Sequence, residues 1–129
     1  MNERNLSRAR ARFAFDEVER WPKNWRDDAT QRVRSLPVQV RTQGLPVVLA
    51  ILLREDKSHS RELAGLISRW VLKEAPRRLL IADSQGAQAL LAACLKADRQ
   101  AYLAAQAEAL AILEMVKLFA DALSKQEGW

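Results

Sequence analysis

The last third of the sequence contains one long stretch in which apolar side chains recur every three or four residues. It starts after Asp98 and continues to about residue 124. Its apolar positions are Tyr102, Ala109, Ile112, Leu113, Val116, Phe119, Ala120 and Leu123. This spacing predicts a long amphipathic helix, capped by Asp98, that buries one face against other helices. No segment elsewhere offers a pair of strands, so we do not expect a sheet.

The rest of the chain predicts shorter helices separated by proline, glycine and polar stretches. We expect them at about residues 5–20, 24–43, 45–53, 60–74 and 84–95, with a loop or helix end at 54–60. The expected capping residues are Asn5 or Ser7, Asn24, and Asp83 or Ser84. Trp21-Pro22 and Pro76 are expected to end helices. The sequence therefore predicts an all-α, single-domain bundle of about six helices over residues 1–129.

Pro37 leaves one alternative open within the second helix. A proline inside a helical pattern either kinks the helix or marks the start of a new one. Arg34 and Arg41 are seven residues apart, so they share a face only if the helix continues through Pro37.

The charge of the chain is uneven and is carried mostly by arginine. Arginine outnumbers lysine fifteen to six, and residues 1–82 carry a net charge of +7 against −2 for residues 83–129. The guanidinium group suits phosphate, so this composition is typical of a protein that binds a polyanion. A general bias toward arginine in the source proteome is the alternative, and composition alone does not separate the two.

Several basic residues flank the apolar segments and are candidates for contact with RNA phosphates. They are Arg26, Arg32, Arg34, Arg41, Arg54, Arg69, Lys73, Arg77 and Arg78. Such contacts need cations spaced along a face but no exact motif. Arg8 and Arg12, with Arg4 one turn earlier, form another row, which we interpret as a solvated face beside nearby acidic residues. We expect Trp21, Trp25 and Trp129 to pack against helix ends rather than to stack on bases, and Trp70 to lie in the core.

The sequence offers little for catalysis. The only histidine, His59, lies in a charged stretch, and Cys94 lies on an Ala/Leu helix where a small core residue is expected. The pairs Asp27-Asp28 and Glu55-Asp56 point in different directions on a helix and do not converge on a metal. No phosphate-binding, nucleophile or zinc motif occurs. We therefore expect no enzymatic activity, no metal and no cofactor.

Compartment signals are few but agree with one another. A single cysteine is normal in a reducing compartment, and the first residues lack the apolar region of a signal peptide. The longest apolar run, residues 45–53, has about half the length of a membrane span. We expect a cytoplasmic protein without membrane contact.

Two segments together resemble a known family. RVRSLPVQVRTQGLPVVLAILL (32–53) has the family's basic helix, Leu-Pro step, Gly-Leu turn and apolar helix. YLAAQAEALAILEMVKLFADAL (102–123) resembles its closing helix at Tyr102, Glu108-Ala109-Leu110-Ala111, Leu113, Lys117, Phe119-Ala120 and Ala122. The family is the small all-helical subunit of type III-B CRISPR effector complexes, the Cmr RNA-silencing module.

The resemblance implies a non-catalytic subunit of a ribonucleoprotein complex. Several copies would stack head to tail beside the backbone and large subunits, and would help to hold guide RNA and single-stranded target RNA. Arg34 and Arg41, which lie in the first matched segment, are then the leading candidates for phosphate contact. Arg26, Arg32, Arg69, Lys73, Arg77 and Arg78 are the second group. The alternatives are a helical protein-interaction adaptor without RNA binding, the small subunit of another type III subclass, or an enzyme of unrecognised type.

Overall fold

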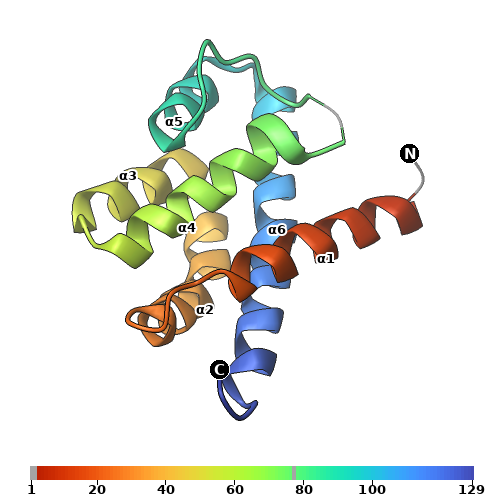
Figure 1. The fold of residues 1–129 in the computed structure, drawn as a ribbon. Helices are drawn as coiled ribbons and strands as arrows, with labels where there is room; N and C mark the ends of the chain where they lie inside the picture. The colour runs from red at the N-terminus through yellow and green to blue at the C-terminus, as the bar shows by residue number, and fades with distance from the viewer. Residues whose placement is uncertain (1–2, 77) are drawn as a thin grey trace.

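The computed structural model describes residues 3–76 and 78–129, and every regular element within them is helical. The elements are α1 (Glu3–Glu19), α2 (Arg26–Gln43), α3 (Leu45–Glu55), α4 (Ser58–Arg69), the π-helical turn η1 (Trp70–Glu74), α5 (Ala87–Lys96) and α6 (Arg99–Ser124). Figure 1 shows α1 and α4 crossing α6, with α3 and α5 on the far side of α4. The predicted all-α bundle with a long C-terminal helix is confirmed.

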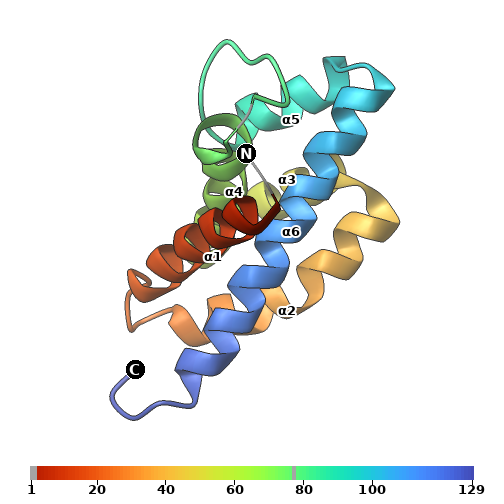
Figure 2. The same cartoon turned by 90° about the vertical axis from the view of Figure 1, so that its right-hand side faces the viewer.

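Helix α6 is the central element of the bundle. Its predicted apolar stripe is buried at five positions and partly buried at Tyr102, Phe119 and Leu123. Both α1 and α2 pack along this helix (Figure 2). The predicted cap is confirmed, because the Asp98 carboxylate accepts a hydrogen bond from the Ala101 N–H at 2.8 Å. This bond satisfies a backbone donor that the first turn of a helix leaves unpaired.

Helix α2 continues through Pro37, which is buried within it. Proline lacks the N–H that would bond to the carbonyl one turn earlier, but the turns on both sides remain helical. The open question about this helix is therefore settled in favour of one continuous element. Arg34 and Arg41 share a face as a result.

The two segments that carry the family resemblance meet at the corner between α2 and α3. Gly44 makes this corner with φ of 92°, and a Cβ there would lie 2.9 Å from the Tyr102 hydroxyl. Gln106 accepts hydrogen bonds through Oε1 from the Leu45 N–H at 2.9 Å and from the Tyr102 hydroxyl at 2.7 Å. Both the backbone conformation and the close approach require glycine at position 44.

Several predicted helix starts are wrong. Helix α1 begins at Glu3, so neither Asn5 nor Ser7 caps it. Trp25 occupies the N-cap position of α2 in place of Asn24, and no side chain bonds to the free N–H groups there. Gly86 occupies that position in α5 in place of Asp83 or Ser84, again without a side-chain cap. A capping residue type near a helix start does not locate the start when the turn before it is set by packing.

Of the two alternatives predicted for residues 54–60, a loop or a helix end, the structure shows helix ends. Helix α3 continues to Glu55 and α4 starts at Ser58, so only two residues connect them. Asp56 turns the chain in the left-handed region at φ of 52°. His59 therefore lies in the first turn of α4 rather than in a loop. At the other end, the Ala75 N–H donates to the carbonyl of Trp70 at 2.8 Å, which is a π-helical bond over five residues.

The core contains one polar cluster that the sequence did not predict. The buried carboxylate of Glu108 on α6 accepts hydrogen bonds from Arg10 on α1 at 2.6 and 2.8 Å. It also accepts one from the indole N–H of Trp70 at 2.8 Å. Trp70 is 1% exposed, as expected of a core residue, and packs against Phe13 with ring centroids 5.1 Å apart. The cluster joins α1, η1 and α6 at one point.

Candidate nucleic-acid interface

Arg34 and Arg41 form a short row on the outer face of α2. Two turns of helix separate them, which corresponds to about 10 Å along the axis. Their side chains are 53% and 54% exposed, respectively. We call these two residues the α2 row. It presents two cations on one face, as the sequence predicts for phosphate contact.

Each cation of the α2 row pairs with a carboxylate on α6. Asp121 accepts from Arg34 at 3.0 Å and Glu114 accepts from Arg41 at 3.3 Å. Arg34 and Arg41 are seven residues apart on α2, and their partners are seven residues apart on α6. Because the two helices run antiparallel, the first arginine meets the second carboxylate and the second arginine meets the first. Ion pairs this exposed contribute about 0–1 kcal/mol each. A phosphate group can therefore replace the carboxylate at little cost.

Arg32 belongs to the interior of the bundle rather than to this row. Its guanidinium binds both oxygens of Glu55 at 3.1 and 2.9 Å and also donates to Gln39 at 2.8 Å. The hydrogen bond from Arg32 lowers the pKa of Glu55, against the opposing effect of burial, and a further bond from Ser60 adds to it. This arrangement joins α2 to the end of α3.

Arg69 is likewise held by carboxylates of its own chain. It donates to Glu17 on α1 at 2.6 Å and to Glu62 on α4 at 2.9 Å. Burial lowers the pKa of Arg69, but the bonds to the two carboxylates outweigh it and raise the pKa above its usual value. Arg69 thus connects α4 to α1, on a different side of α6 from the α2 row.

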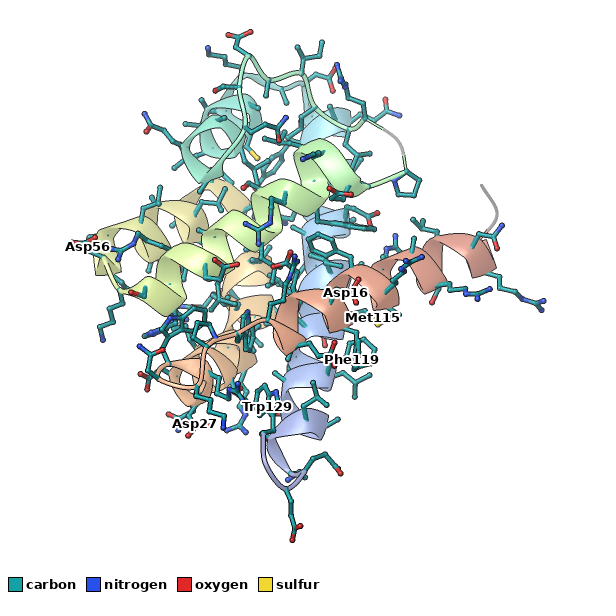
Figure 3. The ribbon with its side chains drawn as sticks, in the orientation of Figure 1. Asp16, Asp27, Asp56, Met115, Phe119 and Trp129 are labelled. Atoms are coloured by element: carbon teal, nitrogen blue, oxygen red, sulfur yellow. The ribbon has the colours of Figure 1, made fainter. Side chains whose placement is uncertain are left out.

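Arg26 lies among the tryptophans at the start of α2. It donates to the carbonyl of Trp21 at 3.1 Å, and its guanidinium lies 4.6 Å from the centroid of the Trp129 ring. Figure 3 shows Trp129 beside the first turns of α2. Trp21 is buried and its ring lies 6.3 Å from that of Trp25. The predicted packing of tryptophans against helix ends is confirmed for these three rings.

The remaining second-group residues lie near the end of η1, away from the α2 row (Figure 1). Lys73 is exposed on η1 and Arg78 is exposed in the segment after it. Arg78 lines a cavity of about 410 Å³ together with Asp98 and Gln100. Arg77 lies outside the described residues. The seven predicted contact residues that the structure describes therefore do not form one surface.

The arginine row on α1 is a solvated face, as the sequence predicts. Arg4 and Arg8 are exposed, and neither makes an ion pair or hydrogen bond with any residue that the structure describes. Arg12, on the same side, is exposed in the same way. The sequence shows the spacing of four residues between these arginines. It also places acidic residues nearby, but in the described structure these do not form ion pairs with the row.

The titratable groups outside these rows are dispersed. Within residues 3–76 and 78–129, no three His, Cys, Asp or Glu side chains gather as metal ligands. Cys94 is buried, which raises its pKa to about 11. Over the same residues, each helix is too short or too polar to cross a lipid bilayer.

An all-helical fold of this size, with arginines on its outer faces and a long closing helix, defines a small basic helical protein. A family model described as CRISPR-associated protein (Cas_Cmr5) matches residues 6–123, which covers most of the chain. The chain belongs to this family and is a small Cmr-type CRISPR-associated subunit. No curated protein matches the sequence.

Proposed function

We propose that the chain is a non-catalytic subunit of a type III-B ribonucleoprotein complex that holds guide and target RNA through the phosphate backbone. Several copies stack head to tail in this proposal, beside the backbone and large subunits of the complex. Its family membership supports the assembly, and its net charge of +5 supports binding to a polyanion.

The single observation that carries RNA binding is the α2 row. Arg34 and Arg41 are half exposed, share one face of a continuous helix, and are held only by exposed carboxylates. Backbone phosphates offer the same charge and the same acceptor geometry as those carboxylates. Contacts of this kind position RNA without reading its sequence.

The first test is an affinity purification of the tagged chain from its native host, with sequencing of the bound RNA. Recovery of CRISPR RNA together with the large Cmr subunits supports the proposed assembly. Recovery of other proteins without RNA overturns it and favours the adaptor. Recovery of subunits from another type III subclass would correct the subclass only.

The second test changes the α2 row in the purified chain. We expect Arg34→Glu with Arg41→Glu to lower RNA affinity at low salt by at least about tenfold and to reduce the salt slope by about one to two phosphate contacts. Lys57→Glu with Lys96→Glu is the matched control, because it changes the net charge equally at exposed positions that are not among the predicted RNA contacts.

Two readouts keep this test decisive. Circular dichroism checks that the helices remain, and Arg34→Gln with Arg41→Gln removes the charges without setting Glu residues against Asp121 and Glu114. RNA affinity that falls no further in the α2-row variants than in the control removes these two residues from the interface.

A further inference from the structure

A cavity of about 600 Å³ lies where the C-terminal end of α1 meets α4 and η1. One wall is aromatic and is formed by Phe13, Trp21 and Trp25. The remaining lining holds four carboxylates against the guanidinium groups of Arg20 and Arg69. An acidic cavity with an aromatic wall is unusual for a chain whose net charge is +5.

Two of the four carboxylates form no ion pair or side-chain hydrogen bond with the residues that the structure describes. Glu17 and Glu62 bind Arg69, and Glu17 also binds Arg20. Asp16 (labelled on α1 in Figure 3) and Glu74 are exposed, and neither forms an ion pair or hydrogen bond within residues 3–76 and 78–129. Free carboxylates beside indole faces favour a cation, and a guanidinium above all, because it also stacks on aromatic rings.

The aromatic wall also contributes a hydrogen-bond donor, which a ligand in the cavity would have to match. Trp21 is 2% exposed, and its indole N–H has no acceptor among the described residues. A buried donor of this kind favours a ligand that brings an acceptor oxygen. A protein segment supplies cationic side chains together with carbonyl or hydroxyl oxygens, whereas a metal ion or a polyamine supplies no acceptor.

The same chain carries such a segment. The N-terminal half of α1 extends beyond the rest of the bundle (Figure 1) and presents Arg4 and Arg8, one turn apart and without an acidic partner in the described chain. We call these two residues the α1 arm. The arm and the cavity lie at opposite ends of one rigid helix, so they cannot meet within a single copy.

We infer that the cavity receives the α1 arm of a second copy, with Arg4 and Arg8 meeting Asp16 and Glu74 beside the aromatic wall. Because the arm and the cavity are different surfaces, the contact is heterologous and leaves one of each free at the ends of every assembly. This inference rests on the proposed head-to-tail stack, and it assigns the two faces that the stack uses.

Sedimentation of the full chain at low salt, over a series of concentrations, tests the assignment. We expect the wild type to grow beyond two copies. The arm variant, Arg4→Glu with Arg8→Glu, and the cavity variant, Asp16→Arg with Glu74→Arg, are each expected to associate at least about tenfold more weakly. Lys57→Glu with Lys96→Glu has the charge change of the arm variant and is expected to associate like the wild type.

A mixture of the two variants gives the sharpest outcome. Each variant retains one intact face and carries one reversed face, so in an equimolar mixture the Arg arm meets the acidic cavity and the Glu arm meets the Arg cavity. The mixture is therefore expected to grow again, with the two variants in alternating order. A chain with all four changes carries the reversed charges on both faces and is expected to associate with itself again. Recovery in the mixture also shows that the separate variants are folded.

The remaining outcomes overturn the inference in different ways. A wild type that stays monomeric, or growth that the arm and cavity variants leave unchanged, removes these two faces. An arm variant that loses RNA affinity beyond the control while it still associates assigns the arm to RNA instead. Failure of RNA binding in the wild type contradicts the proposed function and leaves the sedimentation result intact.

Discussion

Arginine–carboxylate ion pairs occur both in the interior of this molecule and on its surface, and they have different roles in the two places. Arg10 and Arg32 bind carboxylates of another helix with little exposure on either side, whereas the α2 row binds its partners in solvent. Breaking a buried pair leaves a charge without compensation, but an exposed pair exchanges with water and salt at little cost. Burial therefore decides which arginines hold the fold and which are available to a ligand.

The largest expected effect is a loss of stability when a buried carboxylate is removed, compared with the removal of an exposed one. Glu108→Ala removes the carboxylate that Arg10 binds and leaves the buried Trp70 N–H without its acceptor. We expect the free energy of unfolding to fall by about 3–5 kcal/mol. Urea denaturation measures it, with Glu114→Ala as the surface control at under about 1 kcal/mol. Equal losses in the two variants would contradict the distinction between interior and surface.

An intermediate effect is expected at Glu55, which is partly buried. The fold lowers the pKa of this carboxyl below its usual value of 4.5, so the ionised form is the one that the fold stabilises. That contribution is present above the usual value and is lost as the pH falls through the lowered value. We expect Glu55→Gln to reduce stability by about 1–2 kcal/mol at neutral pH. The difference from wild type should shrink in acid, and a difference that does not change with pH would contradict this role.

The smallest effect on stability is expected at the surface pairs, where RNA affinity should change instead. Glu114→Ala with Asp121→Ala frees both residues of the α2 row and should cost under about 1 kcal/mol. We expect RNA affinity to rise several-fold, because the phosphates no longer compete with the two carboxylates. Asp83→Ala with Glu127→Ala changes the net charge equally at exposed positions elsewhere. An equal rise in that control would attribute the effect to total charge.

The long helix was predictable because its signal repeats. The apolar spacing of α6 continues over many turns, and the Asp98 cap lies directly before it. The starts of α1, α2 and α5 were not predictable from caps, since glycine or tryptophan occupies the N-cap position of α5 and α2. Spacing over a long element constrains a helix more than one residue type at its end.

The candidate site was predictable only in part, because an arginine's neighbours come from distant sequence. The spacing of Arg34 and Arg41 was visible, but their partners lie 87 and 73 residues away. Arg10 lies between exposed arginines in the sequence. Its side chain faces Glu108 because of the way α1 is oriented on α6. Tertiary contacts of this kind carry no local signal.

The central place of α6 has a consequence for how the chain folds during synthesis. Helices α1 and α2 both pack mainly on α6, which leaves the ribosome after them. Until then the parts of α1 and α2 that face α6 have no native covering, and the chain is synthesised at about 5–20 residues per second. The nascent protein therefore exposes this apolar surface for most of its translation. The 26-residue helix α6 then covers that apolar surface and closes the bundle.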